Sequence, residues 1–187
     1  MADTKLENIA PDENIPPGWT SNPSAWSERA GLAALALAGL GISVYLALYQ
    51  LGVVPRVWEP FFGNGSEKVL HSVISQMLMP VPDSLLGAGG YLAEIILGTV
   101  GGQRRWRDHP WIVVGFGCVA SIMALVSLIL LICQPVLAQG WCTLCLCSAF
   151  ISFLIVGPAL REARAAIEEL KRRKHPHQSH AFGPATS

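Results

Sequence analysis

Charged residues are scarce in this chain, and two long stretches have none. Only 14% of its 187 residues are Asp, Glu, Lys or Arg, whereas soluble domains carry about 25% to cover their surface. No such residue occurs from Ala30 to Pro55 or from His109 to Leu160. Hydrophobic residues make up 51% of the chain, and the formal net charge is zero. These absences argue against a disordered chain, a soluble globule and a nucleic-acid-binding protein, and they predict a membrane protein.

The first uncharged stretch predicts one transmembrane helix, at about residues 30–54. A helix needs about 20 apolar residues to cross a hydrocarbon core of roughly 30 Å. A polar segment precedes this stretch and no small-residue cleavage site follows it, so we interpret it as a retained span and not as a signal peptide. A weaker span is expected at 84–101, between a proline-rich and a glycine-rich segment, although it contains Glu94.

The second uncharged stretch is too long for a single span. It contains Gln134-Pro135 and Gln139-Gly140, which suit a turn and not a helix interior. We therefore predict two helices, at about 111–133 and 141–160. The expected fold class is an all-α membrane protein, a bundle of four transmembrane helices.

The basic residues predict the orientation of this bundle. Lys and Arg collect on the cytoplasmic side of membrane proteins, and all but two of the 13 fall on the side that holds both termini; Arg56 and Lys68 are the exceptions. We expect both termini to be cytoplasmic. The predicted organisation is a flexible cytoplasmic segment at 1–29, a transmembrane domain at 30–160 and a basic cytoplasmic tail at 161–187.

All five cysteines lie in or beside the last two predicted spans. Cys142-Thr143-Leu144-Cys145 opens the last helix, where the partial positive charge of a helix N-terminus stabilises a thiolate. Two intervening residues let the sulfurs meet in a small disulfide ring, so the pair is a candidate for disulfide exchange. A zinc site would need further ligands nearby, and Cys147 offers at most one, so no metal is expected.

Other interpretations of the cysteines stay open. Cysteine is also a small apolar residue that helices tolerate, which is our interpretation of Cys118 and Cys147. Cys133 is at the expected outer end of the third span, so one hypothesis is that it approaches the pair. We favour a structural role for it.

Several blocks of the chain resemble the vitamin K epoxide reductase family of membrane thiol oxidoreductases. The spans, the long loop after the first of them, and the Cys-x-x-Cys motif agree with that family's pattern. The loop run from Gly65 to Ser72, then Pro82 and Gly90-Tyr91, is similar to the bacterial members. The resemblance covers about residues 32–158. It implies a bacterial inner-membrane protein with the cysteine pair on the outer face.

The resemblance also implies a chemistry and a set of site residues. In the family, loop thiols pass electrons to the cysteine pair, which reduces a quinone held inside the bundle. Cys142 and Cys145 match the pair, with Cys145 nearer the quinone. Ser72 matches a loop hydroxyl near the quinone headgroup, and Asp83 matches a polar quinone contact before the second helix.

Two departures from the family pattern affect that chemistry. The two loop cysteines correspond here to Trp58 and Ser66, so no internal electron shuttle exists. Where some members have a tyrosine four residues after the second redox cysteine, this chain has Ala149.

Three functions follow from these residues. The first is a thiol:quinone oxidoreductase supplied by an external thiol protein, for which a thioredoxin-like protein is the candidate. The second is a non-catalytic membrane subunit or quinone-binding protein of the same fold. The third, a small transporter or channel, depends on Glu94, since ionisable groups inside spans are functional candidates; the alternative is that Glu94 reaches the inner interface. The expected partners are membrane lipid, quinone and the thiol protein, with no nucleic acid.

Overall fold

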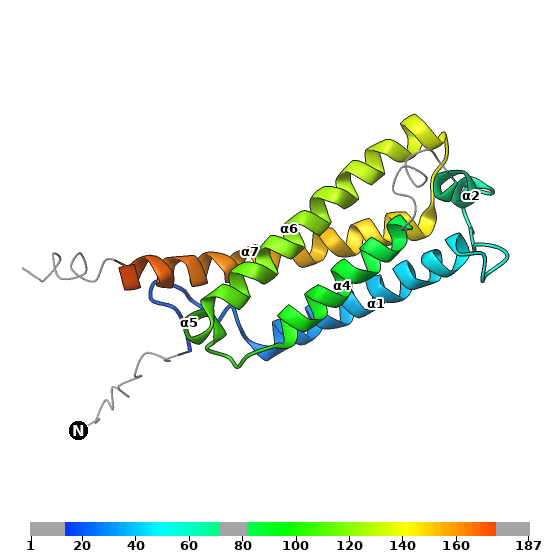
Figure 1. Ribbon diagram of the computed structural model, residues 1–187. Helices are drawn as coiled ribbons and strands as arrows, with labels where there is room; N and C mark the ends of the chain where they lie inside the picture. Colours follow the sequence, from blue (N-terminus) through cyan, green and yellow to red (C-terminus); the bar gives the residue numbers. More distant parts are fainter. Residues whose placement is uncertain (1–13, 72–81, 175–187) are drawn as a thin grey trace, which may run out of the picture.

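The computed structural model describes residues 14–71 and 82–174, and every regular element in these ranges is a helix (Figure 1). The elements are α1 (Trp26–Gln50), α2 (Gly65–Leu70), α4 (Asp83–Thr99), α5 (Arg105–Asp108), α6 (Pro110–Cys133), the π-helical turn η1 (Gln134–Ala138) and α7 (Thr143–Lys174). Helix α1 packs along α4, and α6 packs along α7. Helix α2 lies at one end of the bundle, where α6 and η1 lead into α7, and α5 lies at the other (Figure 1).

Three helices are long and apolar enough to cross a membrane. They are α1, the continuous helix Pro110–Ala138 and α7. This confirms the expectation of an all-α membrane protein. Helix α4 has 17 residues, about 26 Å at 1.5 Å per residue, which is slightly less than the hydrocarbon thickness. The fourth span therefore remains a prediction.

The turn expected from Gln134 is in a different place. Helix α6 ends at Cys133, but the chain continues in helical form as η1 and turns only after Ala138. Proline lacks the amide hydrogen that a regular helix interior needs, and it is accommodated here at the start of the wider π-helical turn. The reversal follows at Gln139, whose φ of 49° is in the left-handed region.

Small residues line the helix contacts, while many large apolar side chains face outward. A Cβ added at Gly39 would lie 2.5 Å from the Tyr91 ring, and one at Gly117 would lie 2.7 Å from the Ala163 side chain. By contrast, Leu37, Ile122 and Phe150 are each at least 60% exposed. Membrane helices associate through small residues and expose large ones to lipid, so this inverted arrangement agrees with a bilayer environment.

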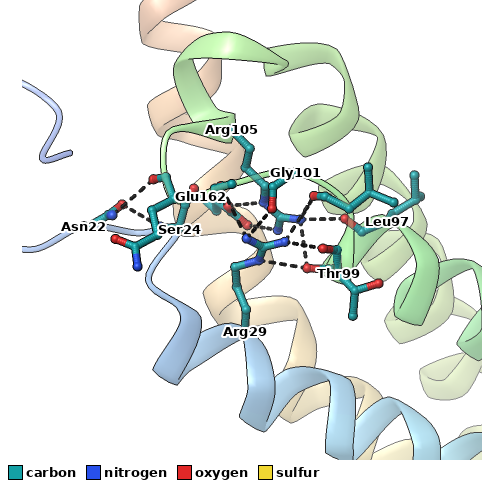
Figure 2. Close-up of polar contacts among 12 residues, drawn as sticks. Asn22, Ser24, Arg29, Leu97, Thr99, Gly101, Arg105 and Glu162 are labelled. Atoms are coloured by element: carbon teal, nitrogen blue, oxygen red, sulfur yellow. Dashed lines mark hydrogen bonds and ion pairs between the residues drawn. The ribbon is translucent and has the colours of Figure 1, made fainter. Parts of the chain in front are cut away.

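One end of the bundle is held by two buried arginines and a buried glutamate, and we call Arg29, Arg105 and Glu162 the arginine end (Figure 2). Arg29 donates hydrogen bonds to the last carbonyls of α4 and those that follow, among them Gly98 and Thr99 at 2.9 and 2.7 Å. Arg105 pairs with Glu162 of α7 at 2.5 and 2.6 Å. These cations satisfy carbonyls that a helix C-terminus leaves free.

The segment before α1 is attached to this end of the bundle. Asn22 donates to the Gln103 carbonyl at 3.1 Å, and the Ser24 hydroxyl donates to the Glu162 carboxylate. Residues 14–25, which lie inside the segment expected to be flexible, therefore contact the loop between α4 and α5 and the helix α7.

Candidate redox site

The two cysteines of the Cys-x-x-Cys motif lie together at the start of α7. Cys142 immediately precedes the helix, and the Cys145 amide donates a hydrogen bond to the Cys142 sulfur at 3.2 Å. Neither cysteine is in a disulfide bond. Cys142 is fully buried and Cys145 is partly exposed. The Cys142 amide donates to the Gln134 side chain at 3.1 Å, so the π-helical turn helps to fix the backbone of the motif.

A carboxylate from the long loop caps the same helix end. Glu59 accepts hydrogen bonds from the Thr143 amide, at 3.0 Å, from the Thr143 hydroxyl and from the Ser66 hydroxyl of α2. An anion at this position complements the positive end of the helix dipole. Burial raises the pKa of the Glu59 carboxyl, but the hydrogen bonds from Ser66 and Thr143 outweigh this effect and hold that pKa below its usual value.

The loop packs against the residues at the start of the motif, Trp141 and Cys142. A Cβ at Gly65 would lie 2.1 Å from the Trp141 carbonyl oxygen, so only glycine allows this approach. The rings of Phe62 and Trp141 lie 6.5 Å apart. As a result Ser66 is buried and its hydroxyl is hydrogen-bonded to the Cys142 thiol. Ser66, which the resemblance to the family matches to a loop cysteine, therefore contacts the first cysteine of the pair.

The surroundings of Cys142 make its thiol acidic. The hydrogen bond from the Cys145 thiol is the largest influence on the Cys142 pKa and lowers it. Burial raises that pKa, and the contact with Ser66 lowers it again. The resulting pKa is about 7, which gives Cys142 a substantial thiolate fraction at neutral pH.

A cavity of about 290 Å³ opens beside the second cysteine. It lies among α1, α4, α6 and α7, and Cys145 is in its wall whereas Cys142 is not. This volume is near the lower limit of about 300 Å³ for small-molecule pockets. The wall is mostly apolar; its polar members are Ser43, Asp83, Ser84, Tyr91, Ser127, Gln134, Cys145 and Ser148.

Of the two residues expected to contact quinone, one can be compared with this cavity. Asp83 lies in its wall, where its carboxylate accepts hydrogen bonds from the Gln50 side chain at 2.5 Å and from the Ser84 amide at 2.9 Å. Ser72 lies outside the described residues. Ala149 is in the cavity wall, so a side chain at that position does face the cavity.

Sequence reasoning missed two residues of the site. Tyr91 of α4 lines the cavity and donates to the Ser148 carbonyl at 2.6 Å, so a phenol is present although position 149 has none. A tyrosine within an apolar helix is a usable signal, since its hydroxyl needs a partner when buried. Glu59 gave no local signal, because it lies 84 residues from Thr143.

Glu94 lies inside the helix bundle. It is 2% exposed, and neither carboxylate oxygen has a hydrogen-bond partner within the described part of the chain. It is not among the described residues in the cavity wall, and neither is Cys133.

The fold and the site together define an integral membrane protein with a dithiol beside an internal cavity. A model of the vitamin K epoxide reductase family matches residues 31–159, so the chain belongs to this family of membrane oxidoreductases linked to quinones. The resemblance drawn from the sequence is thereby confirmed. Comparison with curated proteins and with solved structures gave no match.

Proposed function

We propose that this protein is a thiol:quinone oxidoreductase in which Cys142 and Cys145 carry the electrons. The observation that supports this best is the difference between the surroundings of the two thiols. Cys145 faces the cavity, while Cys142 lies behind it with a lowered pKa and a hydrogen bond to its neighbour. This is the arrangement that a resolving thiol and a substrate-facing thiol need.

The cavity suits the ring of a quinone. Its apolar wall would hold the ring, and Asp83 and Tyr91 lie where they could contact the ring oxygens. An isoprenoid tail would have to leave the bundle between helices. Two electrons from the dithiol and two protons convert quinone to hydroquinone, and the thiols become a disulfide.

Electrons must come from a thiol protein or dithiol outside the chain. Because Trp58 and Ser66 have no sulfur, an external dithiol must reduce the Cys142–Cys145 disulfide and become a disulfide itself. Cys142 has no exposed surface, so the donor must reach Cys145 through the cavity or displace α2.

We further propose four spans, with both termini cytoplasmic and the cysteines at the outer face of a bacterial inner membrane. The basic run from Lys171 to Lys174 ends α7 at the end of the bundle that holds α5. A cysteine introduced at Asn64 should react with an impermeant maleimide in intact cells, and one at Gln103 should not. The reverse pattern would overturn this orientation.

The enzyme proposal is tested with purified protein, a soluble quinone analogue and a small dithiol. We expect quinone reduction that depends on the dithiol, falls to background in Cys145→Ala and is nearly unchanged in Cys118→Ala, which alters an exposed thiol away from the cavity. A second candidate function is favoured by the missing loop sulfurs and the burial of Cys142. If quinone binds but no donor gives turnover above the Cys145→Ala background, the protein is a non-catalytic quinone-binding subunit.

A further inference from the structure

The hydroxyl of Ser66 lies between a carboxylate and a thiol. It donates to the Glu59 carboxylate and is also hydrogen-bonded to Cys142. A hydroxyl has one proton to donate. While Ser66 donates to Glu59, its oxygen can accept only from the Cys142 S–H, so the hydrogen bonds run from thiol to hydroxyl to carboxylate.

From this geometry we propose that Glu59 accepts the proton of the Cys142 thiol through the Ser66 hydroxyl. The Cys142 proton moves to the Ser66 oxygen while the Ser66 proton moves to Glu59. The thiolate then accepts a hydrogen bond from Ser66, and Glu59 becomes neutral. The total charge of the group is unchanged, which matters in a buried site because an added charge is costly there.

This proton relay, from Cys142 through Ser66 to Glu59, acts in the step that closes the Cys142–Cys145 disulfide. Its role with quinone rests on the proposed function. Cys145, bonded through sulfur to an acceptor, is attacked by the Cys142 sulfur. The S–S bond forms, the bond from Cys145 to the acceptor breaks, and the acceptor leaves with the electron pair. With quinone as the acceptor, one proton of the hydroquinone comes from Cys145. The other comes from water, matching the proton that Glu59 returns to water.

The other titratable groups near the pair are few. Asp83 of α4 acts on Cys145, and Tyr91 of α4 lines the cavity. Among the described residues, α1, α6 and η1 contribute no titratable side chain to the cavity wall. Helix α2 carries Glu67 and Lys68, both exposed. Of these carboxylates, Glu59 is the one that is hydrogen-bonded to a partner of Cys142.

The relay and a purely electrostatic role predict opposite effects of Glu59→Gln. The negative charge of Glu59 raises the pKa of Cys142, so its removal alone would make the thiolate more abundant and disulfide closure faster at low pH. If Glu59 accepts the proton, the same substitution slows closure at low pH.

Disulfide closure can be measured without quinone. The reagent is 4,4′-dithiodipyridine, added to full-length reduced protein with Cys118→Ala, Cys133→Ala and Cys147→Ala substitutions. Cys145 takes up the reagent and releases one thiopyridone. Cys142 then attacks the sulfur of Cys145 and releases a second thiopyridone. The absorbance of this second product reports the disulfide closure, which is the step that needs the relay.

The expected result is a change in pH profile. Closure should be nearly independent of pH from 6 to 8 with Glu59 present, since its lowered pKa keeps the acceptor ionised. In Glu59→Gln and Ser66→Ala, closure should instead follow the thiolate fraction of Cys142, whose pKa is about 7, so the rate at pH 6 should be about tenfold lower than at pH 8. Ser66→Thr, which keeps a hydroxyl, should retain the flat profile.

Thr143→Ala is the matched structural control. It removes one hydroxyl contact of Glu59 and leaves the path through Ser66 intact, so its rate should be lowered equally at every pH. Parallel profiles for Glu59→Gln and Thr143→Ala, or a faster rate in Glu59→Gln at pH 6, would overturn the relay. A normal relay profile without quinone turnover would refute the proposed function and leave the relay intact.

Discussion

The two ends of the bundle use the same electrostatics for different purposes. At the arginine end, Arg29 and Arg105 satisfy the carbonyls that close α4, and Arg105 pairs with Glu162. At the opposite end, which we call the cysteine end and define by Glu59, Ser66, Cys142 and Cys145, a loop carboxylate satisfies the N-terminus of α7. In both places an ionised side chain far away in the sequence caps a helix terminus of the opposite polarity.

The two ends differ in whether their polar groups are fixed as donors and acceptors. The charges of the arginine end are fixed in an ion pair with several hydrogen bonds to carbonyls, and a guanidinium group only donates hydrogen bonds. The cysteine end contains a hydroxyl that contacts two partners, Glu59 and Cys142, and two cysteines without a disulfide, of which Cys145 lines the cavity. In the proposed function, its protons and electrons move. A buried polar cluster is therefore structural when its groups are fixed as donors and acceptors, and it can be chemically active when they exchange protons.

The largest effect expected is from Arg105→Met, which would break the arginine end. Glu162 would lose its guanidinium while staying buried, and removal of one partner of a buried pair costs about 3–5 kcal/mol. Unfolding in detergent should show this loss. Arg173→Met, at the exposed pair with Glu169, should cost no more than about 0.5 kcal/mol. Equal losses in the two variants would mean that the buried pair has no special structural role.

The next effect concerns Ser66→Cys at the cysteine end. Since Ser66 contacts the Cys142 thiol, the introduced sulfur should form a disulfide with Cys142 in a Cys145→Ala background. Closing so long a loop should stabilise the fold by about 2–4 kcal/mol. Non-reducing peptide mapping would identify the bond. Glu67→Cys, on the exposed side of α2, should form none, and a bond there instead would contradict the placement of α2.

A smaller effect is expected from Gly65→Ala, which tests how closely the loop covers the thiols. The added methyl would clash with the Trp141 carbonyl, and overpacking of this kind costs about 1–3 kcal/mol. We expect α2 to move away, so that a polar maleimide labels Cys142 faster. Gly89→Ala meets open space and should leave labelling unchanged. Equal labelling in both variants would show that α2 does not limit access.

The smallest effect is expected from Tyr91→Phe in the cavity wall. It removes the hydrogen bond to the Ser148 carbonyl, and one neutral hydrogen bond is worth about 1 kcal/mol. Quinone analogue binding, measured by fluorescence quenching, should weaken less than about tenfold. Tyr45→Phe alters an exposed contact at 3.4 Å with the Arg56 carbonyl and should have no effect. A complete loss of binding in Tyr91→Phe would make the phenol essential for quinone binding.

Much of the fold could be predicted from the sequence, because it depends on local properties. The length of an uncharged apolar run sets whether a helix can cross a bilayer, and this predicted the helices that became α1, α6 and α7. The Cys-x-x-Cys spacing placed two sulfurs at one helix start. The bend after α6 was predicted too early, because Pro135 was taken to end the helix and is instead accommodated in a π-helical turn.

Only the tertiary structure decided how the site is assembled. Glu59, Ser66 and Cys142 come from a loop, a short helix and the start of α7, and no sequence spacing relates them. Their meeting depends on the path of the loop over Gly65, where the absence of a side chain permits contact with the backbone of Trp141. The rotation of α4 likewise brings Tyr91 into the cavity wall. Local composition sets which segments become helices and enter the membrane, but convergence of side chains requires the packing of the whole bundle.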